Sequence, residues 1–182
     1  MSYPSSLTFT SLIVLLTAFH SDIAQANPEN IFFTAINYTK PQVEVLKISQ
    51  GLANKLVRSQ CFRNFMMKRK LVDTNDLTNN EIVNKLITTP IMTPVKMYYS
   101  RKSVIGYRDP PNPTIYTNRR YHEGATACAR ASNLTHEWSH VAGFKHDFKR
   151  TKSRPFSVPY SINDAFLKCC SCKGIKDCKV KE

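Results

Sequence analysis

The chain is poor in acidic residues and in apolar runs of membrane length. Its 182 residues hold 13 Asp and Glu against 26 Lys and Arg, so the formal net charge is +13. No stretch is apolar enough to cross a bilayer comfortably, because the strongest candidate, Leu7 to Phe19, is too short. Internal repeats, low-complexity tracts, zinc-finger spacing and aromatic-basic RNA motifs are also missing, so no specific nucleic-acid partner is expected. The length suits one domain with its own core.

The N-terminal stretch has the pattern of an export signal. Leu7 to Phe19 is apolar and interrupted only by Thr and Ser, and Ala24-Gln25-Ala26 offers a small-x-small cleavage site. We therefore predict a signal peptide over residues 1–26 and a secreted or periplasmic mature chain over 27–182, without a membrane span. Because no Lys or Arg precedes Leu7, the alternative is a buried N-terminal helix.

The mature chain is strongly cationic. Removal of residues 1–26 removes one acid, Asp22, and no base, so the net charge rises from +13 to +14. Such a charge favours anionic surfaces or acidic substrates as partners. The alternative is a solvated basic surface that aids solubility.

Six cysteines are present, all in the mature chain, and four of them fall between Cys169 and Cys178. An even number in an exported chain favours disulfides, whose pairing the sequence leaves open. A zinc site at the Cys169-x-x-Cys172 pair is the competing interpretation. Cys128 is either a disulfide partner or a reactive thiol.

Local patterns predict an α+β domain with a mixed sheet. An extended piece at 31–39 precedes a helix over 41–68, and the capping-box pattern Thr78–Glu81 opens a short helix that Pro90 ends. β-branched and aromatic residues then indicate at least two strands, within 95–108 and 114–121. A helix over 125–143 with Thr126 as N-cap, an irregular loop over 149–160 and a final helix over 161–170 complete the order.

The predicted helix over 125–143 ends in the stretch HEWSHVAGFKHD, which carries three of the chain's five histidines. His136 and His140 are four residues apart, so their side chains project about 40° from each other on one helix face. Glu137 is offset by about 100°, beside an ion held by the two imidazoles. The apolar positions of the helix, Trp138 among them, lie on the opposite side, which is compatible with a site but does not require one.

Gly143 could end the helix in the left-handed conformation and turn the chain back, so that His146 reaches the same ion. Three neutral histidines leave one coordination position open, as in catalytic zinc sites. We therefore predict one catalytic Zn²⁺ held by His136, His140 and His146. Zinc lowers the pKa of its bound water, and Glu137 would act as general base.

The spacing His136-Glu137-x-x-His140-x-x-Gly143-x-x-His146 resembles that of the metzincin metallopeptidases. The following Asp147 is similar to the adamalysin branch, and Gly143-Phe144-x-His146 to the astacin branch. The resemblance implies a small zincin domain with an upper part over about 27–142 and a lower part over about 143–182. It also implies a peptide substrate that lies antiparallel along an edge strand, for which residues 114–121 are the candidate.

One family feature is missing, because metzincins carry a methionine in a tight turn beneath the zinc and no methionine follows Met97. Ser157-Val158-Pro159-Tyr160 looks like the astacin turn with proline at the bend. Tyr160 would then be a fifth ligand or a hydrogen-bond donor to the oxyanion. The alternative is an ordinary proline turn with a packed tyrosine.

The sequence thus predicts a monomeric, exported zinc endopeptidase that acts on proteins or peptides. The rival is a cationic exported binding protein or effector on the same scaffold, without proteolytic activity. A hydrolase of cell-wall peptides would share the chemistry and differ in substrate. A second His-Glu pair, His122-Glu123, has no histidine at position 126 and is expected in a loop or at a cleft rim.

Overall fold

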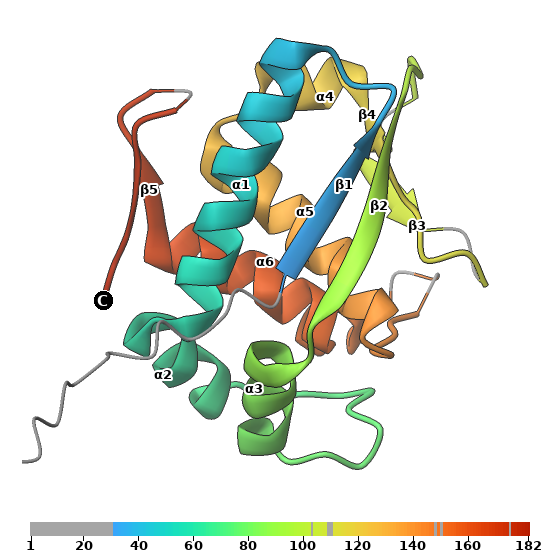
Figure 1. Cartoon of the computed structure of the whole chain (residues 1–182). Coiled ribbons are helices and arrows are strands. Elements are labelled where there is room, and N and C mark those ends of the chain that lie inside the picture. The colour runs from blue at the N-terminus through green and yellow to red at the C-terminus, as the bar shows by residue number, and fades with distance from the viewer. Residues whose placement is uncertain (1–30, 103, 109–110, 148, 150, 175) are drawn as a thin grey trace, which may run out of the picture.

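A mixed four-stranded sheet, helices packed on one of its faces and a small C-terminal hairpin make up the fold, which is α+β (Figure 1). The computed structural model describes residues 31–182 except 103, 109, 110, 148, 150 and 175, so the predicted signal peptide lies outside the described part. The elements are β1 (Ile31–Ile36), α1 (Lys40–Arg58), α2 (Gln60–Lys68), α3 (Asn79–Thr88), β2 (Ile91–Tyr98), β3 (Gly106–Arg108), β4 (Ile115–Asn118), α4 (Arg119–Gly124), α5 (Ala127–Val141), the 3₁₀ turn η1 (Arg154–Phe156), α6 (Val158–Cys169), β5 (Cys170–Cys172) and β6 (Cys178–Val180).

The single helix predicted over 41–68 is wrong, because the chain breaks at Ser59 into α1 and α2. Ser59 has extended backbone angles, φ −69° and ψ 148°, and caps the second helix. Its hydroxyl donates to the carbonyl of Leu56 and accepts from the amide of Phe62. A serine that bonds the backbone on both sides replaces the helical hydrogen bonds it interrupts.

The capping box that opens α3 is confirmed. Thr78 Oγ1 accepts from the amide of Glu81, and Glu81 Oε2 accepts from the amide of Thr78 at 2.8 Å. Two backbone donors at the helix start are thereby satisfied by side chains.

The sheet has the strand order β1-β2-β4-β3, in which β1, β2 and β4 are parallel and β3 runs antiparallel to β4. The prediction of an edge strand over 114–121 is therefore wrong. Only Ile115–Asn118 is strand, and it lies inside the sheet. Asn118 Oδ1 accepts from the amide of Arg120 and starts α4, so the extended backbone ends there. The edge strand on this side is β3.

Helices α1 and α5 cover one face of the sheet, and α6 packs along α5 (Figure 1). The core between these layers contains Leu56, Phe62, Ile115, Trp138 and Phe166, each at most 1% exposed. Trp138 is fully buried on α5, so this helix is held firmly on its apolar side.

All six cysteines form disulfides, which pair Cys61 with Cys169, Cys128 with Cys170 and Cys172 with Cys178. The alternatives of a zinc site at Cys169 and Cys172 and of a reactive Cys128 thiol are thus excluded. Three disulfides suit an oxidising compartment. Among the helices of the described ranges, none has the length and apolarity to cross a membrane.

Candidate metal centre

Helix α5 begins and ends as its sequence predicts. Thr126 Oγ1 accepts from the amide of Ala129 at the N-terminus. At the C-terminus Gly143 has φ +97°, the left-handed conformation that glycine adopts without strain. Fully buried Phe144 donates its amide to the carbonyl of Ser139 at 3.0 Å and anchors the turn. The chain therefore reverses after α5 and brings His146 back to the helix.

His136, His140 and His146 form one cluster. Their ring centroids are 5.2 Å apart for His136 and His140, 5.3 Å for His136 and His146, and 4.8 Å for His140 and His146. One ring nitrogen from each residue lies within 4.8 Å of the corresponding nitrogens of the other two. A single ion could contact all three.

Each histidine of this cluster contacts a protein group through Nδ1. His140 Nδ1 lies 2.8 Å from the carbonyl oxygen of Phe144, and His146 Nδ1 lies 3.1 Å from that of Asp147. His136 Nδ1 lies 3.1 Å from the side-chain amide nitrogen of Asn163. Metal-binding histidines commonly donate one ring N–H to a protein oxygen, as His140 and His146 can do here through Nδ1. In these two residues Nε2 is then the nitrogen that could face an ion. At His136 the partner is an amide nitrogen, which donates to Nδ1.

The two helical histidines are held in the neutral form. Burial, reinforced by the neighbouring His140 and His146, lowers the pKa of His136 to about 3. Burial also lowers the pKa of His140 to about 4, against the opposing hydrogen bond to Phe144. A neutral imidazole has the lone pair that a metal ion requires.

Glu137 is only 6% exposed, and burial raises the pKa of its carboxyl group to about 7. The charge of Arg108 on β3 acts in the opposite direction and favours the carboxylate. Arg108 is also fixed to the end of α5, because its Nη1 donates to the carbonyl of His140 at 3.2 Å. A carboxyl group with a pKa near neutrality can both accept and release a proton at physiological pH.

Tyr160 lies beside the histidine cluster, with its ring centroid 5.0 Å from His136 and 4.9 Å from His146. The tight turn predicted at 157–160 is wrong, and the irregular loop predicted over 149–160 is wrong only from Val158 on, where α6 begins. Ser157 is the N-cap of α6 and Pro159 stands in its first turn, where a proline needs no amide hydrogen. The Pro159 backbone raises the pKa of His136, against the larger effect of burial. The helix start thus brings Tyr160 to the position that the turn was expected to supply.

Two arginines near the cluster were missed by the sequence analysis. Arg154 of η1 donates a hydrogen bond to the Tyr160 hydroxyl, and its guanidinium carbon lies 4.9 Å from the centroid of that ring. Arg108 comes from β3, 28 residues before His136. No spacing rule connects an arginine on an edge strand or in a 3₁₀ turn with a helix motif, so no sequence pattern could have found them.

His122 lies in helix α4 and not in a loop, and together with Glu123 it lines a pocket of about 360 Å³, as the cleft-rim alternative predicts. It is 3% exposed within α4, its ring packs edge-on against Tyr38, and the carbonyl of His122 accepts from Arg130. Burial lowers its pKa to about 4. This histidine belongs to the packing between α1, α4 and α5.

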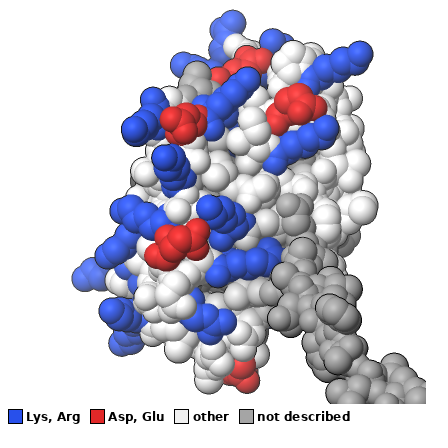
Figure 2. Space-filling model, turned by 60° about the vertical axis from the view of Figure 1, so that its left-hand side comes forward, with Lys and Arg blue, Asp and Glu red and all other residues white. Residues whose placement is uncertain are grey.

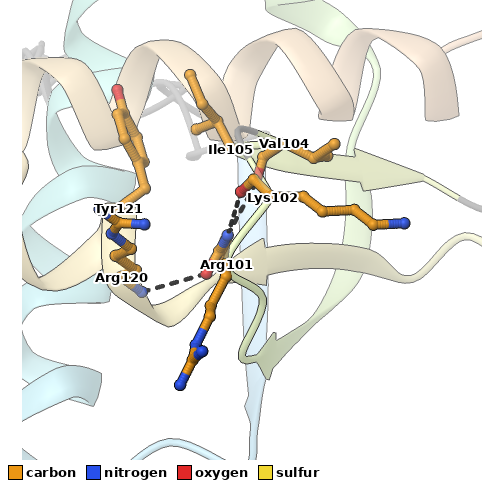
Figure 3. Close-up of a pocket in the computed structure, with 7 residues that line it drawn as sticks. Arg101, Lys102, Val104, Ile105, Arg120 and Tyr121 are labelled. Atoms are coloured by element: carbon orange, nitrogen blue, oxygen red, sulfur yellow. Dashed lines mark hydrogen bonds between the residues drawn. The ribbon is translucent and has the colours of Figure 1, made fainter.

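A pocket of about 370 Å³ lies next to the start of β3, and none of its lining residues is one of the three clustered histidines. Asn118 organises it, because its side-chain amide donates to the carbonyls of Lys102 and Val104 (Figure 3). Arg101 and Lys102 point in different directions in this view. The cationic side chains therefore do not converge on one point.

Comparisons of the chain with protein-family models, curated proteins and solved structures find no match. The function of this chain must therefore be inferred from the chemistry of its own residues.

Proposed function

We propose that this protein is a secreted or periplasmic zinc-dependent endopeptidase of metzincin type. The observation that carries the proposal is the cluster of His136, His140 and His146, each with Nδ1 against a protein group and with ring nitrogens close enough for one ion. Buried Glu137 stands next to the first of these ligands.

The donor set suits zinc. Zn²⁺ prefers imidazole and thiolate ligands, and three protein ligands leave the open position of a catalytic site. A bound zinc ion would supply Lewis acidity toward water and toward a substrate carbonyl group. His136 and His140 are neutral without any ion, so little free energy is lost in deprotonating them.

Glu137 would act as the general base. Its pKa is raised to about 7, so at neutral pH the carboxyl group can either accept or donate a proton. The carboxylate would take a proton from the attacking water and deliver it to the amine nitrogen that leaves. Arg108 would keep a fraction of the carboxyl groups ionised, because a nearby positive charge favours the carboxylate.

Tyr160 would donate a hydrogen bond to the oxyanion that develops on the substrate carbonyl. Its hydroxyl oxygen accepts from Arg154, which leaves the phenolic hydrogen for another acceptor. The fifth-ligand role remains the alternative for Tyr160. A Tyr160→Phe variant keeps the ring contacts with His136 and His146 and removes the hydroxyl. We expect kcat to fall by about ten- to a thousandfold, with zinc content unchanged.

The substrate would lie along the outer edge of β3. This strand takes over the role that the sequence assigned to residues 114–121. An edge strand offers unpaired amide and carbonyl groups to an extended peptide. Strand β3 is the last strand on its side of the sheet, and Arg108 at its end contacts the carbonyl of His140. The bound backbone would thus pass the histidine cluster.

The second candidate function is a cationic exported binding protein that keeps zinc and cleaves nothing. It is favoured by the net charge of +13 and by the lack of any methionine after Met97. Glu137 opposes it, since a buried carboxyl group costs free energy that a structural zinc site does not require.

The test compares the mature chain with its Glu137→Gln variant by elemental analysis for zinc and by cleavage of a mixture of unfolded proteins. One zinc in both proteins, with cleavage by the parent alone, supports the peptidase. Zinc in both and cleavage by neither supports the binding protein. Absence of zinc from both would refute the metal site.

A further inference from the structure

The hairpin of β5 and β6 lies beside α1, and β6 contacts this helix (Figure 1). Near one end, Lys176 lines a pocket together with Pro41 and Gln42 of α1. Toward the other end, Lys55 Nζ lies 3.4 Å from a carboxylate oxygen of Glu182. Two segments more than a hundred residues apart in sequence thus share one side of the molecule.

This surface is dominated by lysine. Lys40, Lys47 and Lys55 are exposed and fall within about 80° on the wheel of α1. We name these three residues and the exposed lysines of the hairpin segment the hairpin face, which comprises Lys40, Lys47, Lys55, Lys173, Lys176, Lys179 and Lys181. Exposed acids in the two segments are Glu44, Asp177 and Glu182. Figure 2 shows this side, where blue clearly exceeds red.

The hairpin is covalently fixed to the core. Cys172–Cys178 joins its two strands, Cys128–Cys170 attaches it to α5, and Cys61–Cys169 holds its base to α2. Val180 is buried, so the neighbouring Lys179 points outward. The lysines of the hairpin therefore lie on a backbone that the disulfides hold in a fixed position.

The residue types on this face favour a flat anionic partner. Lysine presents a hydrated point charge, whereas recognition of individual phosphates or carboxylates commonly uses the planar arginine side chain. Binding of a single polymer chain commonly uses a groove with aromatic side chains, and neither α1 nor residues 170–180 contain an aromatic residue. Clusters of four to eight basic residues are typical of anionic membrane surfaces.

We propose that the hairpin face binds the surface of an anionic lipid bilayer. The attraction is electrostatic, so it acts over about 10 Å at moderate salt and weakens as salt rises. The proposal does not depend on the proposed peptidase activity, because the histidine cluster contributes no residue to the face.

Docking through this face leaves the histidine cluster away from the bilayer. Tyr160 lies in the first turn of α6 and Cys169 at its last position. Nine residues of helix separate them, which corresponds to about 14 Å. The bilayer would thus hold the protein by one end of α6, with the cluster at the other end.

The experiment measures binding of the mature, zinc-supplemented chain to vesicles by cosedimentation. One set contains phosphatidylglycerol and phosphatidylcholine in equal amounts, and the other contains phosphatidylcholine alone. We expect binding to the anionic vesicles only, and release in 0.5 M salt as expected from a Debye length of roughly 4 Å. The Glu137→Gln variant should bind the vesicles as the parent does. A failure of the peptidase proposal can therefore be distinguished from a failure of the membrane proposal.

The matched variants carry four Lys→Gln substitutions each and have the same net charge. One changes Lys173, Lys176, Lys179 and Lys181, and the control changes Lys102, Lys145, Lys149 and Lys152, which lie outside the hairpin face. We expect the hairpin variant to lose at least about tenfold in vesicle affinity and the control less than about threefold. Intact disulfides by mass spectrometry verify folding, and a Lys40, Lys47 and Lys55 variant tests the other half of the face.

Three results would overturn the proposal. Equal losses of vesicle affinity in the two fourfold variants would show that net charge alone determines binding. Equal binding to both vesicle types would exclude recognition of anionic lipid. Binding to dextran sulfate without binding to anionic vesicles would assign the face to an acidic polysaccharide.

Discussion

Gly106 on β3 lies directly against Asn133 on α5. A Cβ atom at position 106 would stand 2.7 Å from Asn133 Oδ1 and 3.0 Å from the carbonyl oxygen of Tyr116. Asn133 precedes Glu137 by one helical turn, so this contact sets how closely the edge strand approaches the helix of the candidate site.

Replacement of Gly106 by alanine should therefore destabilise the fold by about 1–3 kcal/mol, because the Asn133 side chain must rotate away and the added Cβ still stands against the backbone carbonyl of Tyr116 on β4. Gly51→Ala is the matched control, since nothing lies within 4 Å of its added Cβ and Gly51 is exposed inside α1. The control should gain about 0.5–1 kcal/mol from better helix propensity. Urea unfolding measures both changes, and equal effects would contradict the close contact.

Zinc should stabilise the chain through the three histidines. Free zinc at about a hundred times its dissociation constant adds roughly 2.7 kcal/mol to the free energy of unfolding, and a chelator removes this gain. His146→Gln should lose most of the zinc-dependent increase in Tm. His122→Gln should keep it, because His122 lies in α4 outside the cluster. A zinc effect that survives in His146→Gln would place the ion elsewhere.

His122 should make the fold less stable in acid. Its pKa falls from 6.5 to about 4 on folding, chiefly by burial and also by the charge of Arg130, with Glu123 opposing. The folded pKa is the lower one, so the contribution is complete above pH 6.5 and is lost as the pH falls toward 4. The loss approaches about 3 kcal/mol.

The check on His122 is the difference in unfolding free energy between the parent and His122→Gln at several pH values, with zinc present. Above about pH 7 the parent should be the more stable protein, and the difference should shrink steadily toward about pH 4.5. A difference that does not change with pH would show that His122 does not titrate with folding.

The disulfides should contribute unequally to the free energy of unfolding. Cys61–Cys169 closes a segment with a sequence separation of 108, whereas Cys172–Cys178 has a separation of 6. Chain-entropy estimates give about 4.8 kcal/mol for the first and about 2 kcal/mol for the second. Paired Cys→Ala variants, compared by chemical denaturation, should therefore differ by about 2–3 kcal/mol. A larger loss from the short bridge would contradict the entropic account.

Local sequence patterns predicted those parts of the fold that local physics determines. The Thr126 cap, the Thr78–Glu81 box and the left-handed Gly143 each depend on a few neighbouring residues, and all three are present. The cluster of three histidines was predictable from the same local rules. The helix period brings His136 and His140 together, and the turn at Gly143 brings back His146.

Features that depend on distant segments were not predictable in this way. The position of β4 inside the sheet depends on β3 pairing with it and on β2 on its other side. The apolar pattern continues across Ser59 and predicted one helix. The helix breaks there because the Ser59 hydroxyl bonds the backbone of Leu56 and Phe62. Arg108 and Arg154 reach the cluster only because the sheet and η1 carry them there.

The pairing of the cysteines has a consequence for how the protein matures. Each of the three bridges uses at least one cysteine from residues 169–178. While ribosomes are still making the preceding part of the chain, none of these bridges can close, and Cys61 and Cys128 stay available to wrong partners. Native bridges can therefore form only after Cys169 has been made, and a nascent chain arrested before that residue would depend on packing alone to hold α5 in place.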